Sequence, residues 1–392
     1  MKKISMFMSA LALLAFASCE ENNDLGDDFI EDGFYVVGDA TGSDEIQADY
    51  MMAAGFNEVT KSKRDGMYEK YVALEAGKTF SLAIYEAGEI TLYGAEFADM
   101  DLTGRDNNPP IVIKRGALIE GADAPKMSVE KTGLYHIVLD LNKNKDLNTA
   151  LIIVSPATWG VRGAMNGWGY TPMNASKFDK KSITYTLKDV KVEIPGGFKF
   201  AYAHGWKVDM DDAGNVKSEI GLGNDAEASN LELMPENLVQ YGKDIQIKRG
   251  IWDIELVWTL VGGNLSKNFK AKMTKTGSVP LTDNPAEYQL GLVGAIGGSN
   301  WDKDFPFTYV AGSTYKYEIA SQAIEADAQF KVRTVGVWDK INLGYDSVTI
   351  TGDKDNFESK DGNILCKTAG TYKITLSFDA EEWLWTLDFT KK

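Results

Sequence analysis

Hydrophobic and polar residues alternate along most of this chain, which is the pattern of half-buried β-strands. The alternation is clearest in a segment that starts with glycine, places an aromatic residue two positions later and continues with an apolar residue at every second position. Three copies occur, at residues 133–139, 250–256 and 370–376, and they start 117 and 120 residues apart. A second strand-like run follows each copy. This spacing suits one β-sandwich per repeat, so the pattern predicts three related sandwiches in tandem.

We therefore predict an all-β protein made of three tandem immunoglobulin-like or carbohydrate-binding β-sandwich modules after a signal peptide and a short acidic tether. The predicted boundaries are 1–18 for the signal peptide, 19–32 for the flexible tether, 33–155 for the N-terminal sandwich, 158–276 for the second sandwich and 287–392 for the C-terminal sandwich. All nine tryptophans lie after residue 158. The N-terminal sandwich is therefore expected to be a spacer, with a weak site on Tyr85 and Tyr93 as the alternative.

A second repeated pattern places tryptophans beside a Phe–Lys strand in the last two modules. One tryptophan ends a glycine-rich turn upstream of that strand, and another follows its phenylalanine by eight positions. The matching residues are Trp168, Lys199 and Trp206 in the second module and Trp301, Lys331 and Trp338 in the third. Alternation in the third module puts Lys331 and Arg333 on the face opposite Phe330 and Val332.

Indole rings beside cationic side chains suit a flat, uncharged ligand that is rich in hydroxyl groups. A sugar ring offers an apolar C–H face to an aromatic plate and a rim of hydroxyls to charged donors. The predicted glycan-binding residues are Trp301, Lys331, Arg333, Trp338, Trp168, Lys199 and Trp206. Ala201 stands where Arg333 stands in the third module, so the second site is expected to be weaker or differently selective.

These residues also have a purely structural interpretation. Trp168 and Trp301 would then plug the end of a sandwich core, and the two lysines and Arg333 would be ordinary solvated strand residues. Four further tryptophans fall on alternating apolar faces and are expected in the core: Trp252, Trp258, Trp383 and Trp385.

Composition narrows the range of ligands. The formal net charge of −16 argues against nucleic acid as a partner, since binding nucleic acid needs clustered lysine and arginine. The two histidines, His136 and His204, lie 68 residues apart, and His136 alternates onto the polar face of its strand. A histidine-based zinc site or catalytic triad therefore has little to build on, and we expect no metal and no cofactor.

The N-terminus has the features of a targeting segment. Lys2 and Lys3 precede an apolar run at residues 4–17 that is too short to span a membrane, and small residues then lead to Cys19. This start resembles a bacterial lipoprotein signal, with lipid attached to the Cys19 thiol; an ordinary secretory signal is the alternative. The acidic run after Cys19 is predicted to be a disordered tether, and it resembles the surface-export signal of Bacteroidota lipoproteins.

The lipoprotein-like start, the three modules and the repeated tryptophan and lysine motifs together resemble the SusE/SusF outer-membrane lipoproteins over essentially the whole mature chain. The resemblance implies non-catalytic binding of polysaccharide, above all a starch-like α-glucan, by an aromatic cradle with a cationic donor. It further implies anchoring to the outer membrane through Cys19, facing the exterior, beside a TonB-dependent transporter and a companion glycan-capturing lipoprotein.

Two other functions stay open from the sequence. A surface glycosidase needs two suitably spaced carboxylates, and the chain has 57 acidic residues from which to supply them. A structural or adhesive lipoprotein would bind another protein in place of a glycan.

Overall fold

The structure is a computed structural model that describes residues 30–57, 62–102, 111–141, 146–202, 209–210, 216–218, 222–224, 238–240, 242–262, 268–282 and 284–392. The predicted signal peptide, Cys19, nearly all of the tether, His204 and Trp206 lie outside these residues. Within them the chain folds into β-strands joined by turns and short 3-10 segments, so the predicted all-β class is confirmed. None of the helical segments described is long and apolar enough to cross a membrane.

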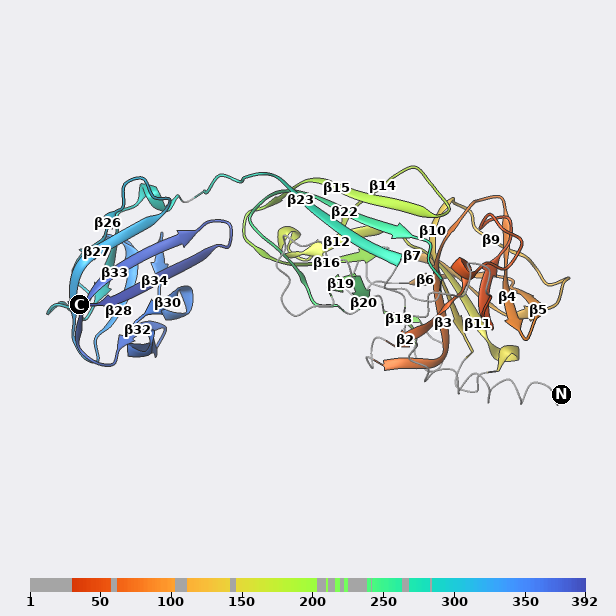
Figure 1. The fold of residues 1–392 in the computed structure, drawn as a ribbon, viewed down its shortest axis with the longest axis horizontal. Coiled ribbons are helices and arrows are strands. Elements are labelled where there is room, and N and C mark those ends of the chain that lie inside the picture. The colour runs from red at the N-terminus through yellow and green to blue at the C-terminus, as the bar shows by residue number, and fades with distance from the viewer. Residues whose placement is uncertain are drawn as a thin grey trace. The chain divides into compact units, whose positions relative to one another are not determined.

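The described strands form three pairs of facing sheets, one pair for each repeat of the sequence pattern (Figure 1). Chain contacts group them into two compact units. The first unit takes in the described residues up to Val190 together with Gly196–Ile247 and Trp252–Lys275, and it holds the first two sandwiches. The second unit takes in Lys191–Pro195, Lys248–Ile251 and Thr276–Lys392, and it holds the third sandwich.

The first sandwich pairs a five-stranded sheet with a six-stranded one. The first sheet runs β1 (Gly33–Val37), β4 (Thr79–Glu86), β5 (Glu89–Gly94) and β8 (Ile119–Glu120), with β9 (Met127–Ser128) beside β4. The second sheet runs β2 (Ala53–Asn57), β3 (Ser62–Leu74), β10 (Gly133–Asp140), β11 (Leu151–Pro156), β7 (Ile111–Ala117) and β6 (Ala98–Leu102). The 3-10 segments here are η1 (Ala48–Tyr50) and η2 (Leu147–Thr149).

The second sandwich has the same two-sheet plan. One sheet runs β13 (Thr171–Pro172), β12 (Trp159–Gly163), β16 (Gly196–Tyr202), β19 (Leu222–Asn224) and β20 (Leu238–Gln240), with β21 (Ile245–Ile247) beside β16. The other runs β14 (Asn174–Ala175), β15 (Ser182–Val192), β22 (Gly250–Thr259) and β23 (Phe269–Gly277). A small ribbon of β17 (Asp209–Met210) and β18 (Val216–Ser218) and the segment η3 (Ala164–Asn166) complete it.

The third sandwich repeats this plan once more. Its first sheet runs β25 (Asp304–Pro306), β24 (Leu290–Gly294), β28 (Gln329–Thr334), β32 (Asn363–Cys366) and β31 (Phe357–Lys360), with β29 (Asn342–Leu343) beside β28. Its second sheet runs β26 (Thr308–Tyr309), β27 (Lys316–Ile324), β33 (Gly370–Asp379), β34 (Leu384–Lys391) and β30 (Thr349–Gly352). The 3-10 segments are η5 (Pro285–Glu287), η6 (Tyr345–Ser347) and η7 (Lys354–Asn356).

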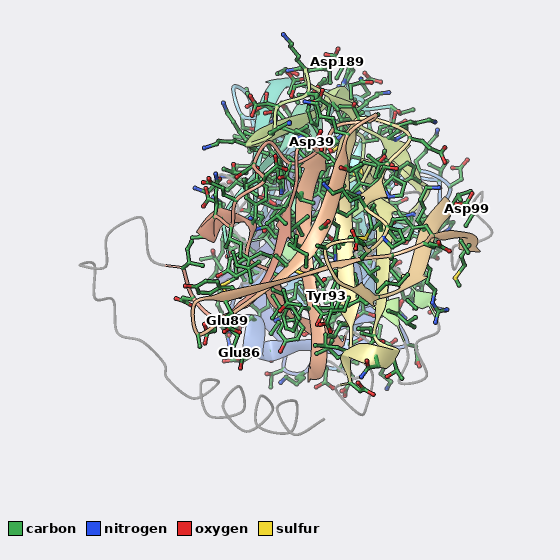
Figure 2. The ribbon with its side chains drawn as sticks, turned by 90° about the vertical axis from the view of Figure 1, so that its right-hand side faces the viewer. Asp39, Glu86, Glu89, Tyr93, Asp99 and Asp189 are labelled. Carbon is green, nitrogen blue, oxygen red and sulfur yellow. The ribbon has the colours of Figure 1, made fainter. Side chains whose placement is uncertain are left out.

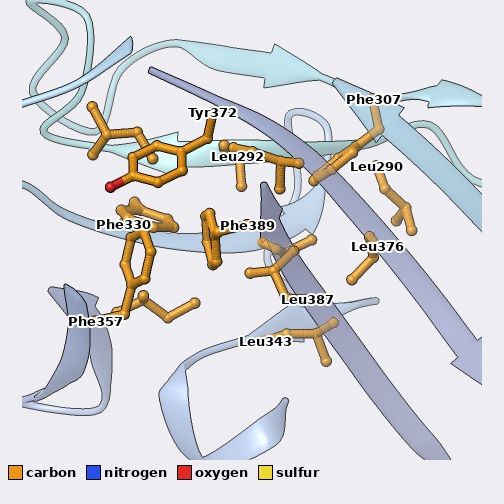
Figure 3. Packing of buried hydrophobic residues seen from close by; sticks show 14 of the residues in the cluster. Leu290, Leu292, Phe307, Phe330, Leu343, Phe357, Tyr372, Leu376, Leu387 and Phe389 are labelled. Carbon is orange, nitrogen blue, oxygen red and sulfur yellow. The ribbon is translucent and has the colours of Figure 1, made fainter. Parts of the chain in front are cut away.

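The core of the third sandwich is aromatic, and it fixes which face of each strand points outward. Figure 3 shows Phe330, Phe357 and Phe389 gathered between the sheets, with the last two rings stacked at a centroid distance of 3.9 Å. The three glycine–aromatic segments of the sequence form β10, β22 and β33, each in the interior of its sheet. Along β33 the inward residues Tyr372 and Ile374 are fully buried, as the alternation predicted.

In the first unit, the second sandwich covers one face of the first. Tyr71 of β3 lies with its ring centroid 4.9 Å from that of Phe269 and 6.1 Å from that of Trp159, and both partners belong to the second sandwich. Tyr71 also stacks on His136 at 4.4 Å, and the His136 Nε2 lies 2.8 Å from the Glu69 carboxylate. The polar strand face to which the sequence pattern assigns His136 is therefore buried, because the neighbouring sandwich covers it.

Candidate functional site

The tryptophan turns of the second and third sandwiches begin from equivalent places. Gly163 pairs with Phe198 in the second sandwich, and Gly294 pairs with Phe330 in the third. A Cβ atom on either glycine would lie 2.3 or 2.5 Å from the Cβ of its phenylalanine. Each strand end can approach the Phe–Lys strand so closely because glycine has no side chain.

The two turns then give their tryptophans the same unusual backbone conformation. Trp168 has a φ of 63° and Trp301 a φ of 67°, in the left-handed region that bulky residues rarely occupy. The Trp168 N–H donates to the Gly163 carbonyl at 2.8 Å, and the Trp301 N–H donates to the Gly294 carbonyl at 3.2 Å. Such a conformation costs on the order of 1 kcal/mol or more, so its recurrence at two equivalent tryptophans is a reason to look for a function there.

These tryptophans lie at the surface. Trp168 and Trp338 are each 44% exposed, and Trp301 is partly buried. Trp168 therefore does not plug the end of a core. A single exposed indole is ordinary, whereas adjoining exposed aromatic rings form the kind of apolar patch that marks a ligand surface.

The third sandwich brings three of the predicted residues together. The rings of Trp301 and Trp338 lie 6.3 Å apart between centroids and are inclined by 34°. The Arg333 guanidinium carbon lies 4.3 Å from the centroid of the Trp338 ring, within cation–π distance. We call this arrangement of Trp301, Trp338 and Arg333 the cradle.

Arg333 is held in place by a carboxylate. Its Nε and Nη2 donate to the two Asp304 carboxylate oxygens at 2.7 and 2.9 Å, and the two side chains are 9% and 12% exposed. These hydrogen bonds from Arg333 hold the pKa of the Asp304 carboxyl below its usual range. The structure therefore places Arg333 as a support for the Trp338 ring and not as an open hydrogen-bond donor.

Lys331 shares the outer face of β28 with Arg333. Its side chain is partly buried, and a Cβ atom on Gly344 would lie 3.4 Å from its Cε. Among the residues that the structure describes, Lys331 has no carboxylate within ion-pair distance. Its ammonium is therefore the cation of this face that is left to donate to a ligand.

The second sandwich carries a different set of side chains at the equivalent positions. The Lys199 Nζ lies 3.4 Å from the Asp244 carboxylate, and the lysine side chain is 25% exposed. The Tyr170 ring occupies the space over Gly160, with ring carbons 2.5 Å from where a Cβ would stand. Sequence reasoning missed Tyr170, although its place two residues after Trp168 was an available signal.

The first sandwich has replaced the site residues. Gly38 takes the place of Gly163 and Gly294, because a Cβ there would lie 2.7 Å from the Phe80 Cα. Val37 pairs with Ser81, which puts a serine where the other sandwiches have lysine. Tyr93 is 5% exposed and donates to Glu120, so it offers no open plate, and burial raises its pKa.

The hairpin beside these positions is acidic and aliphatic. Figure 2 shows Glu86 and Glu89 together at one end of the β4–β5 hairpin, with Tyr93 further along β5. Ile90 of β5 is 57% exposed, and the residues before and after it along the strand point to the opposite face of the sheet. This surface differs in chemistry from the aromatic and cationic one of the third sandwich.

The four tryptophans that were expected in the core divide into two groups. Trp252, Trp258 and Trp385 are buried, at 8%, 0% and 9% exposure, which confirms the prediction for these three. Trp383 is 41% exposed and has a φ of 57°, so the prediction is wrong for it. The reason is that Trp383 occupies the turn between β33 and β34, where strand alternation does not apply.

Comparison with known proteins finds only a distant structural likeness. It matches no protein-family model and no curated protein sequence. Among solved structures it is similar to the crystal structure of SusF from Bacteroides thetaiotaomicron, with 13% sequence identity and a TM-score of 0.24. The similarity covers 82% of this chain and 72% of that one. A likeness this distant carries no functional conclusion, so we base the function on the geometry of the site.

Proposed function

We propose that this protein binds polysaccharide at its surface and leaves it intact, and that the third sandwich carries the principal site. The observation behind the proposal is the cradle, in which two partly open indole rings lie 6.3 Å apart and a buried arginine supports the Trp338 ring. Such rings match the apolar faces of successive sugar units. The related turn with Trp168 and the adjoining strand with Lys199 make the second sandwich a further candidate, with Trp206, which lies outside the described residues, as its predicted third residue.

The inclination of the rings supports a curved ligand. Coplanar rings would suit a flat, ribbon-like chain, whereas rings inclined by 34° follow a chain that turns between successive sugars. A starch-like α-glucan curves in this way, which makes it the preferred ligand. Lys331 is the proposed donor to sugar hydroxyls, and Arg333 holds Trp338 from below.

Two acids beside the cradle, Asp302 and Asp304, favour binding over hydrolysis. A glycosidase needs a general acid whose pKa is raised so that it carries a proton at neutral pH. Asp302 accepts hydrogen bonds from the Ser299 hydroxyl and the Asn300 N–H, and Asp304 is held by Arg333. These bonds lower the pKa of both carboxyl groups, which is the opposite of what a general acid requires.

The cellular setting is proposed from the N-terminal sequence. A lipidated Cys19 would anchor the chain to the outer membrane with its sandwiches facing the exterior. There it would retain glycan for uptake, with a TonB-dependent transporter and a companion glycan-capturing lipoprotein as its partners.

Affinity electrophoresis of the purified wild-type protein through gels that contain different polysaccharides tests this function. We expect retardation by amylopectin or glycogen, little retardation by cellulose derivatives, and no release of reducing sugar on long incubation. Release of reducing ends would assign the protein to the glycosidases instead. Equal mobility in every gel would contradict glycan binding and favour a protein ligand.

A further inference from the structure

Asp304 holds two parts of the cradle at once. One carboxylate oxygen accepts from Arg333 Nε at 2.7 Å, and the other accepts from Arg333 Nη2 at 2.9 Å and from the Gly336 N–H at 3.0 Å. Arg333 lies directly below the Trp338 ring, and Gly336 belongs to the turn that carries Trp338. The same carboxylate therefore fixes both the support of the ring and the backbone that delivers it.

The geometry of this clamp is that of a positioning device. A two-point bond between a guanidinium and a carboxylate fixes the plane of the arginine as well as its distance. Gly336 has a φ of 78°, so the turn reverses sharply at the residue that Asp304 binds. Val335, Val337 and Trp338 around it are exposed, at 36%, 40% and 44%. A turn with so little buried side-chain surface depends on such anchors for a single conformation.

We infer that Asp304 is a positioning residue that sets the inclination of Trp338 against Trp301 through Arg333 and the Gly336 turn. Asp304 acts beneath the rings and does not contact the glycan. Its role rests on the proposed function insofar as the cradle binds glycan, but the arrangement of the two rings in the free protein does not depend on any ligand.

The residues of the second sandwich at the positions equivalent to Asp304 and Arg333 support this interpretation. Gly160 pairs with Ala201, as Gly291 pairs with Arg333, so Ala201 is the counterpart of Arg333. Thr171 pairs with Val161, as Phe305 pairs with Leu292, so the preceding residues Tyr170 and Asp304 correspond. The acid and the arginine are thus replaced together, as expected of two residues that work as one unit.

The experiment compares Asp304→Asn with Asp99→Asn in the full-length protein. Asp99 is a matched control because it forms an exposed ion pair with Lys114 at 2.9 Å in the first sandwich. Two indole rings at 6.3 Å give an exciton couplet in circular dichroism. The part of this signal that is lost in Trp338→Ala comes from the Trp301–Trp338 pair, so it reports how the two rings are arranged. Binding of amylopectin is measured alongside by affinity electrophoresis, and folding is checked by urea unfolding.

We expect Asp304→Asn to reduce the couplet to about the level of Trp338→Ala and to weaken amylopectin binding by about fivefold or more, since a disordered ring must be reordered on binding. Asp99→Asn should leave both unchanged. A folded Asp304→Asn protein with a wild-type couplet would overturn the inference. If Asp304→Asn reduces the couplet as expected but the wild-type protein binds no polysaccharide, the inference about Asp304 stands and only the proposed function is contradicted.

A second variant covers the case in which Asp304→Asn fails to fold. Arg333→Lys keeps the charge pair but loses the planar two-point bond and the flat surface under the indole. We expect it to fold, to lose most of the couplet and to bind amylopectin less tightly. An unchanged couplet in Arg333→Lys would count against the clamp.

Discussion

At the scale of single residues, the structure places bulky side chains where the backbone disfavours them. Trp168 and Trp301 adopt left-handed backbone angles at equivalent turns, and Trp168 buries only part of its ring. The sequence repeat identified both residues, since glycine-rich turns before an indole recur at matching positions. It gave no sign of the strain, because φ at a turn depends on where the preceding strand ends.

Substitution at Trp168 separates strain from side-chain contacts. Trp168→Gly and Trp168→Ala lose the same ring, but glycine accepts a φ of 63° without steric cost. We expect Trp168→Gly to be more stable than Trp168→Ala by about 1 kcal/mol in urea unfolding. The reverse order, which is normal for strand positions, would show that this turn is not strained.

At the scale of strands, alternation predicted which residues share a face, but not which residues meet across the sheet. Lys331 and Arg333 lie on the outer face of β28, as expected from Phe330 and Val332. Asp304 reaches Arg333 from β25, a strand of three residues that is too short to show a periodic pattern. Its partnership depends on sheet register, which the sequence of one chain does not reveal.

The strand ends at Gly294 and at Gly133 offer a contrast for testing close strand approach. A Cβ on Gly294 would lie 2.3 Å from the Gln329 carbonyl oxygen and 2.5 Å from the Phe330 Cα, whereas one on Gly133 would meet nothing within 4 Å. We expect Gly294→Ala to lower the free energy of unfolding by about 2 kcal/mol, because the contacts are with backbone. Gly133→Ala should change it by less than about 0.5 kcal/mol. Equal effects in chemical denaturation would argue against the close approach.

At the scale of the whole molecule, the three sandwiches that correspond to the sequence repeats are grouped into two compact units. The repeats predicted three sandwiches, and the described strands form three pairs of sheets. The sequence pattern did not predict that Tyr71 and His136 are buried between the first two sandwiches. A polar strand face has the same pattern whether another sandwich covers it or water does. The third sandwich belongs to a separate unit with its own core.

This division predicts separate responses to mutation. Tyr71→Ala removes a ring that contacts Phe269 and Trp159, so it should destabilise the first unit by about 3 kcal/mol. Calorimetry should show a lowered transition for that unit and an unshifted one for the third sandwich, with amylopectin binding at the cradle retained. A parallel shift of both transitions would mean that the units unfold together.

The cradle as a glycan site is tested most directly by comparing Trp338→Ala with Trp383→Ala in amylopectin affinity electrophoresis. Both tryptophans belong to the third sandwich and are similarly exposed, at 44% and 41%, but Trp383 lies on the β33–β34 turn and is not part of the cradle. Loss of the Trp338 ring should weaken retardation by about tenfold or more, as expected for one aromatic ring that a bound sugar covers. Trp383→Ala should migrate like the wild type. Equal retardation of both variants and the wild type would contradict the account.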